Sequence, residues 1–308
     1  MPIERETVST PVTEAPLPTH DVDRTVAQPA DRDAAGGRPP SFVIIGGQRC
    51  GTTWLHRAIA EHPEVFVADP KELHFFDNHY ERGLGWYYGR FTPSNGHKAW
   101  GEATPAYLHR PECDTRLHAA APDARLVAIL RHPVDRAYSA YQLMRNTLSA
   151  GMSFEEALGA SPELIERGLY ADHLERWFGL FGRDRVLVLL YDDLQTDEAG
   201  FVARVFEHLG VDASFRPSML GRVDNAVIFP RLRDRLRRAG LEPAVQAIKR
   251  TPARRWIQRF VAARKRRGRG QAYAGVPADL RARLLERYAE PNERLARLIG
   301  RDLSAWGA

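Results

Sequence analysis

Residues 42–55 read FVIIGGQRCGTTWL, and this stretch is the strongest indication of the fold in the sequence. The apolar run 42–45 ends in Gly46 and Gly47, which is typical of a buried parallel strand that enters a tight turn. A helix is expected from about Thr53, with apolar residues at three- and four-residue spacing and Pro63 beyond its end. A strand, a glycine-containing loop and a helix in this order can bind an anion through backbone N–H groups and the positive end of the helix dipole.

The rest of the chain repeats the alternation of strand and helix. Further short apolar strands are expected over 65–67, 126–130 and 186–190, and helices over 134–146, 153–159, 163–179, 199–209 and 279–299. This order predicts an α/β fold with a central, mainly parallel sheet flanked by helices. We expect residues 41–308 to form one domain. Residues 1–40 hold seven of the 21 prolines without a helical or strand period, and are predicted to be a disordered tail.

Composition limits the classes of protein that the chain can represent. Residues 231–270 contain 15 Lys and Arg against two acids, although the whole chain carries a net charge of only +5. The charge is therefore local, which argues against a uniformly cationic nucleic-acid binder. Two cysteines make no disulfide framework, and no leader-like or membrane-spanning apolar run is visible, so we expect a soluble cytoplasmic protein. The Ala- and Arg-rich usage is typical of a bacterial genome of high GC content.

The glycine loop departs from the nucleotide-binding pattern G-x-x-x-x-G-K-[ST] at one position. Gly46, Gly51 and Thr53 fit the pattern, but Thr52 stands where the lysine is expected, and the cation of the loop is Arg49. The backbone can still bind an anion. The lysine that would reach a γ-phosphate is missing, which makes ordinary kinase or ATPase chemistry less favoured.

The loop resembles the 5′-phosphosulfate loop of the sulfotransferases that use 3′-phosphoadenosine 5′-phosphosulfate (PAPS). The resemblance implies a P-loop-like fold of the sulfotransferase and nucleoside-kinase type, with PAPS as sulfuryl donor and no metal. Where the family usually has lysine this chain has Arg49, which can hold phosphate and stabilise charge but is a poor proton donor. The residues expected to bind the 5′ end are Gly47, Gln48, Arg49, Cys50, Gly51, Thr52, Thr53 and Trp54.

A second motif, RHPVDRAYSAY at residues 131–141, follows the strand expected over 126–130. Arg131 then stands at the carboxyl end of a central strand, where open α/β sheets place ligands, and Ser139 lies about two helical turns further on. On its own such an arginine also fits a structural ion pair. The motif is similar to the 3′-phosphate motif of the same family, which implies that Arg131 and Ser139 bind the 3′-phosphate. His132 is expected to be a packing residue.

Candidates for a catalytic base lie between the two motifs. Transfer to a hydroxyl or amine needs a base near the acceptor proton, and Glu72 and His74 in KELHFFD are suitable, although they also fit an exposed pair beside an aromatic patch. KELHFFD followed by GLGWY resembles the glycan sulfotransferases of the heparan-sulfate type, which implies that Glu72 is the base and that Glu72 and His74 face the acceptor. Residues 101–107, GEATPAY, resemble that subgroup's E-K-[ST]-P-[AS]-Y with Ala103 in place of lysine; Glu102 fits either an orienting role or an ion pair.

The resemblance extends over roughly residues 41–306. The segment 168–177 and the strand ending at 190–194 resemble the family's later helix and strand and are expected to be structural. Counting back from Tyr288 and Asn292 aligns Arg269 and Gly270 with a Lys-Gly-Arg loop that closes over the nucleotide in the family, while a plain basic loop is the alternative.

The sequence thus predicts a PAPS-dependent sulfotransferase with catalytic residues Glu72 and Arg49. The acceptor is expected to be a glycan or a small molecule, such as a glycosylated secondary metabolite, and no nucleic acid is expected as a partner. Two alternatives remain: a small-molecule kinase with an altered phosphate loop, and a non-enzymatic polyanion binder that uses residues 231–270.

Overall fold

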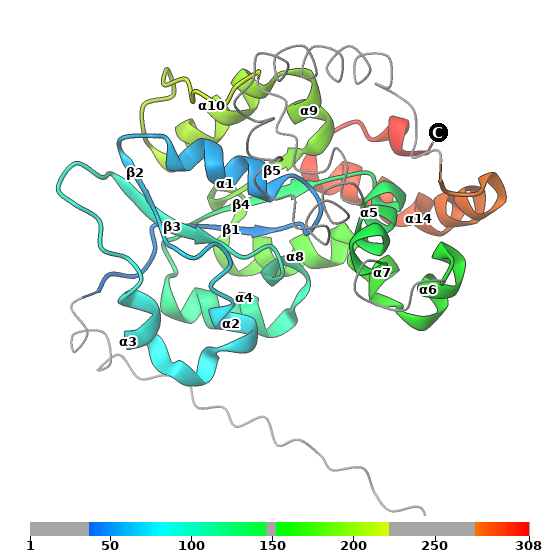
Figure 1. Ribbon diagram of the computed structural model, residues 1–308, viewed down its shortest axis with the longest axis horizontal. Coiled ribbons are helices and arrows are strands. Elements are labelled where there is room, and N and C mark those ends of the chain that lie inside the picture. Colours follow the sequence, from blue (N-terminus) through cyan, green and yellow to red (C-terminus); the bar gives the residue numbers. More distant parts are fainter. Residues whose placement is uncertain (1–36, 146–151, 222–274, 308) are drawn as a thin grey trace, which may run out of the picture.

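The computed structural model describes residues 37–145, 152–221 and 275–307 (Figure 1). The strands are β1 (Phe42–Gly46), β2 (Val65–Val67), β3 (Ala99–Ala103), β4 (Arg125–Leu130) and β5 (Val186–Leu190). The α-helices are α1 (Thr52–Ala60), α2 (Phe75–Asn78), α3 (Gly83–Tyr88), α4 (Pro111–Ala120), α5 (Pro133–Met144), α6 (Phe154–Ala160), α7 (Glu163–Glu166), α8 (Tyr170–Phe181), α9 (Tyr191–Thr196), α10 (Glu198–Leu209) and α14 (Ala278–Ile299). Short 3-10 helices are η2 (Tyr80–Arg82), η3 (Tyr107–His109), η4 (Arg183–Arg185) and η5 (Ser304–Gly307).

The strands form one parallel sheet with the order β2-β3-β1-β4-β5. The expected parallel α/β architecture is therefore confirmed. β1 lies in the centre, where Val43 pairs with Glu102 on β3 and with Leu126 on β4. Strand β3 has the sequence AWGEA and was not expected, because it lacks the continuous apolar run that marked the other strands.

Helices cover both faces of the sheet, which makes three layers (Figure 1). All residues of β1 are buried, and their side chains alternate: Val43 and Ile45 join the core beneath α3, α4 and α8, while Phe42 and Ile44 join the core beneath α1 and α10. A further apolar cluster joins α5, α6 and α7 to α14. β4 leads into α5 and β1 leads into α1, so both helices begin at the carboxyl edge of the sheet.

The helix expected over 163–179 is interrupted at residues 167–169, so the prediction of one continuous helix was wrong. α7 ends at Glu166 and α8 begins at Tyr170. Between them, a Cβ on Gly168 would lie 2.9 Å from the Tyr288 hydroxyl and 3.0 Å from Pro133. The close packing of this turn against α14 and α5 overrides the helical periodicity of the sequence.

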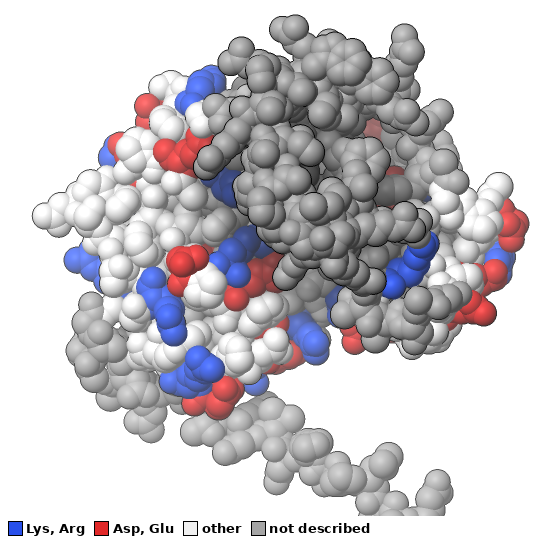
Figure 2. All heavy atoms as spheres, in the orientation of Figure 1, with Lys and Arg blue, Asp and Glu red and all other residues white. Residues whose placement is uncertain are grey.

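Several predictions fall on residues outside the described ranges. These include Arg269, Gly270, all of the basic segment 231–270 and most of the expected tail. Residues 37–40 are described and contact the sheet, since Pro39 accepts a hydrogen bond of 2.8 Å from the Trp100 indole. Over the described surface that Figure 2 shows, basic and acidic side chains are interspersed. No helix in the described ranges is long and apolar enough to cross a membrane.

Candidate active site

The candidate residues follow the carboxyl ends of neighbouring strands. The glycine loop follows β1, Arg131 follows β4, Thr104 follows β3, and the segment that carries Glu72 follows β2. In an open parallel sheet this edge is where ligands bind. The fold therefore gathers predicted residues from distant parts of the sequence at one edge.

The glycine loop leaves the amino end of α1 open to an anion. Gly51 is the N-cap with φ of 99°, a conformation that favours glycine, and no side chain caps the helix. The first turn also carries no acidic residue. Because the first N–H groups of a helix have no partner within it, they and the helix dipole form an anion-binding position. At the start of the loop, Gly46 is required because a Cβ there would lie 2.4 Å from the Leu108 Cβ.

The two predicted phosphate motifs meet. Arg49 donates a hydrogen bond from Nε to the Ser139 hydroxyl at 3.2 Å, and Arg131 donates from its guanidinium to the Arg49 carbonyl oxygen at 3.2 Å. Arg131 also lies 4.8 Å from the ring centre of Tyr191, a cation–π arrangement. Two guanidinium groups and one hydroxyl, from the segments after β1 and β4, are thus adjacent beside the start of α1.

Residues that the sequence reasoning did not assign to the site support this arrangement. The Tyr170 hydroxyl donates to the Arg131 carbonyl at 2.9 Å and lies 3.8 Å from the Cys50 sulfur, so it connects both phosphate motifs. Arg167 donates to the Gln48 side-chain oxygen at 2.5 Å and also pairs with Glu163. Burial raises the pKa of the Cys50 thiol, which is consistent with a packing role for this side chain. His132 is buried beside Trp306, as expected of a packing residue.

The candidate base belongs to a chain of contacting polar side chains. Glu72 Oε2 lies 3.2 Å from His74 Nε2, and His74 Nδ1 lies 2.8 Å from Asp77 Oδ2. The second Glu72 oxygen accepts a hydrogen bond of 2.6 Å from Lys71. The Asp77 side chain is 3% exposed and the Glu72 side chain 34%, so the chain of groups runs from the interior to the surface. Asp77 was not predicted, although it ends the KELHFFD motif three residues after His74.

The base segment is electrostatically connected to α1. Burial, and next the nearby positive charge of Lys71, lower the pKa of His56 on α1 to about 4, although the carboxylates of Asp69 and Glu72 oppose this. Glu72 and Lys71 therefore lie near the helix whose amino end forms the anion-binding position.

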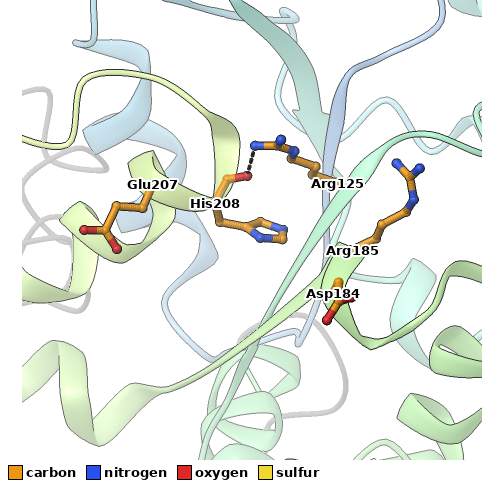
Figure 3. A pocket seen from close by; sticks show the side chains of 5 residues that line it. All are labelled: Arg125, Asp184, Arg185, Glu207 and His208. Atoms are coloured by element: carbon orange, nitrogen blue, oxygen red, sulfur yellow. Dashed lines mark hydrogen bonds between the residues drawn. The ribbon is translucent and has the colours of Figure 1, made fainter.

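A cavity of about 560 Å³ lies elsewhere, at the amino ends of β4 and β5 (Figure 3). Its lining residues are Arg125, Asp184, Arg185, Glu207 and His208. Both arginines make structural contacts between separate segments. Arg125 donates to the His208 carbonyl at 2.5 Å, and Arg185 contacts Asp123 at 3.0 Å. We therefore do not assign this cavity to the candidate active site.

Comparison with known proteins identifies the family. The sequence matches the family described as "Sulfotransferase domain" over residues 39–237. The chain belongs to this family. It is 34% identical to mouse heparan sulfate glucosamine 3-O-sulfotransferase 6 over 182 residues, which are 56% of this chain and 53% of the relative. It is 28% identical to mouse bifunctional heparan sulfate N-deacetylase/N-sulfotransferase 3 over 297 residues, 87% of this chain and 31% of the relative. The chain thus spans about half or less of the length of these relatives.

A solved structure agrees with this membership of the sulfotransferase family. The crystal structure of a sulfotransferase from Alicyclobacillus acidocaldarius has a TM-score of 0.65 and 28% sequence identity, covering 88% of this chain and all of that chain. The predicted family and fold are confirmed.

Proposed function

We propose that the chain is an enzyme that transfers a sulfuryl group from PAPS to a hydroxyl or amine of a carbohydrate acceptor. Membership of the sulfotransferase family and likeness to the heparan sulfate enzymes support this reaction. The observation that carries the proposal is the contact of Arg49 with Ser139 at 3.2 Å, because it brings the two phosphate motifs side by side.

The residues present fit a donor with anionic groups at two positions. We assign the 5′-phosphosulfate to the open amino end of α1, the loop amides and Arg49, and the 3′-phosphate to Arg131 and Ser139. When bound, PAPS supplies an activated sulfuryl group. The permanent charge of Arg49 stabilises the negative charge that develops on the donor side, without giving up a proton.

On the acceptor side, Glu72 receives the proton. A carboxylate only accepts hydrogen bonds, so Asp77 holds the Nδ1 proton of His74, and Nε2 of the same ring faces Glu72 Oε2. Asp77 thus fixes the ring orientation of His74 and leaves the lone pair of Nε2 facing Glu72 Oε2, so a proton taken up by Glu72 can be shared between these two atoms. Lys71 holds the other oxygen at 2.6 Å. As the acceptor oxygen or nitrogen bonds to sulfur, the bond from sulfur to the 5′-phosphate oxygen breaks and 3′-phosphoadenosine 5′-phosphate leaves. The acceptor proton passes to Glu72 Oε2, where it is held between Glu72 and His74.

The experiment for this proposal is a transfer assay with PAPS that carries radiolabelled sulfate and a panel of acidic and neutral oligosaccharides. We expect label on a sugar, and no label with Glu72→Gln, which keeps the size of the side chain. Label transfer that Glu72→Gln leaves unchanged would remove Glu72 from the role of base. Phosphate transfer from Mg-ATP in place of sulfate transfer would support the small-molecule kinase instead, although Thr52 in the lysine position argues against it.

Several finer assignments remain predictions. A bacterial source and a cytoplasmic location are among them, as are the single domain at 41–308 and the roles of Arg269 and Gly270. The polyanion-binding alternative depends on residues 231–270, which lie outside the described ranges.

A further inference from the structure

Glu102 is a buried carboxylate whose hydrogen bonds lead into the segment that carries the proposed base. It lies on β3 and is 1% exposed. Its Oε1 accepts hydrogen bonds of 3.0 Å from Tyr87 and from Tyr107, and its Oε2 accepts one of 2.6 Å from Thr104. Ala103 follows it where the family motif has lysine. The contacts described for Glu102 include no ion pair. Of the two roles that the sequence allowed, this favours the orienting role.

Two of these hydroxyl groups also accept hydrogen bonds from backbone N–H groups. Tyr107 accepts from the Phe75 N–H at 2.9 Å and from the Phe76 N–H at 3.4 Å. Thr104 accepts from the His74 N–H at 3.3 Å. Because a carboxylate can only accept, each hydroxyl proton points to Glu102 and its lone pairs remain free for the backbone. The Leu73 N–H interacts with Glu102 itself, so the network reaches residues 73–76.

The backbone that this network holds has an unfavourable conformation. Glu72 has φ of 61° and His74 has φ of 50°, both in the left-handed region that residues other than glycine seldom adopt. Such a conformation persists where surrounding contacts determine the backbone strongly. The hydrogen bonds that converge on Glu102 supply such contacts immediately after Glu72.

We propose that Glu102 is a positioning residue: by orienting the hydroxyl groups of Thr104 and Tyr107, it fixes the backbone of residues 73–76 and so directs Glu72 and His74 toward the acceptor. The inference rests on the proposed function, since it takes Glu72 as the base. Its own evidence is the hydrogen-bond network, which can be measured without any turnover.

Two buried tyrosines offer a matched comparison. Tyr87 and Tyr107 are both fully buried and donate to the same Glu102 oxygen at the same distance, but of the two only Tyr107 has a described contact with the backbone of residues 75–76. We expect Tyr107→Phe to lower kcat by about 10- to 100-fold, as expected when a catalytic group is displaced, with unchanged affinity for 3′-phosphoadenosine 5′-phosphate (PAP). Tyr87→Phe removes an equivalent hydrogen bond to Glu102 and should leave kcat close to that of the unaltered protein.

Thr104 and Glu102 give a second comparison, should Tyr107→Phe fail to fold. Thr104→Val keeps the shape and removes the hydroxyl, whereas Thr104→Ser keeps the hydroxyl; we expect the serine variant to retain the kcat that the valine variant loses. Glu102→Gln places an amide donor opposite one of the hydroxyls, whose proton must then turn away. We expect Glu102→Gln to lower kcat in the same way without a change in PAP affinity.

Amide-resolved hydrogen exchange decides the proposal independently of activity. We expect Tyr107→Phe to speed exchange at Phe75 and Phe76, and Thr104→Val to speed it at His74, with no such change for Tyr87→Phe. Equal effects of Tyr87→Phe and Tyr107→Phe on exchange or kcat, or unchanged exchange in the Tyr107 and Thr104 variants, would overturn the proposal. If the unaltered chain transfers no sulfate, the proposed function fails, while the exchange contrast still decides whether Glu102 fixes this segment.

Discussion

The Arg49 guanidinium donates a hydrogen bond from Nε to the Ser139 hydroxyl at 3.2 Å, although the two residues are 90 positions apart in the chain. One lies in the loop after β1, the other on α5 two helical turns into the segment after β4. Their contact brings the two proposed phosphate motifs side by side near the open end of α1. This geometry leads to predictions for each part of the candidate site.

Ser139→Ala is expected to weaken PAP binding by about 10- to 100-fold, because a hydrogen bond to a charged group is lost. Isothermal titration measures the affinity. Ser304→Ala is the matched control, since Ser304 is exposed and bonds only to Asp302 among the contacts described for it. Equal affinity of the Ser139 variant and the control would remove Ser139 from the nucleotide site.

Substitutions of Arg49 test whether its guanidinium takes the catalytic role of the family's lysine. Arg49→Ala is expected to lower kcat by about 100-fold or more, since it removes a charge that stabilises the transition state. Arg49→Lys restores the residue of the family motif and should keep kcat within about tenfold of the unaltered protein, because both side chains carry a positive charge. A lysine variant as inactive as the alanine variant would show that the planar geometry of the guanidinium, including its bond to Ser139, is essential.

Substitutions of Glu72 and Asp77 should lower kcat without weakening the binding of PAP. Glu72→Gln is expected to lower kcat by about 10²- to 10⁴-fold, the usual range for loss of a general base. Asp77→Asn should cause a smaller loss, because it weakens the orientation of His74 but leaves Glu72 in place. Steady-state kinetics and PAP titration separate the two effects. A large loss of PAP affinity in either variant would contradict the assignment of this segment to the acceptor side.

Much of this site could be predicted because the sequence signals are local. The loop glycines, Arg49 and Arg131 each follow a strand that its apolar residues reveal. Asp77, Arg167 and Tyr170 were missed because their part depends on tertiary contacts, such as the bond from the Tyr170 hydroxyl to the Arg131 carbonyl at 2.9 Å. β3 was missed for a related reason: its Gly101 and Glu102 are not residues typical of strands. Glu102 is tolerated there because hydroxyl groups from other elements satisfy its carboxylate.

Two half-buried histidines, His109 and His173, determine how stability is expected to depend on pH. Burial and the nearby Arg167 lower the pKa of His109 to about 3, and burial and Arg176 lower that of His173 to about 4, against an ordinary value of 6.5. Between about pH 6.5 and 4 the unfolded chain therefore binds protons that the folded chain does not, and the free energy of unfolding must fall as the pH falls through this window.

His109→Gln removes one of these protons. The slope of unfolding free energy against pH should decrease by up to about 1.4 kcal/mol per pH unit in that window. Urea unfolding at a series of pH values measures the slope. Identical slopes for the variant and the unaltered protein would mean that His109 takes up its proton in the folded state as readily as in the unfolded chain.

Isothermal titration of PAP into the unaltered protein and into Arg131→Ala measures whether this edge of the sheet binds the nucleotide. We expect a dissociation constant of about 10 µM or tighter for PAP, much weaker binding of the same nucleotide without its 3′-phosphate, and a clearly smaller difference in Arg131→Ala. No binding of PAP, or equal binding of both nucleotides, would contradict the assignment of this edge of the sheet as a PAPS site.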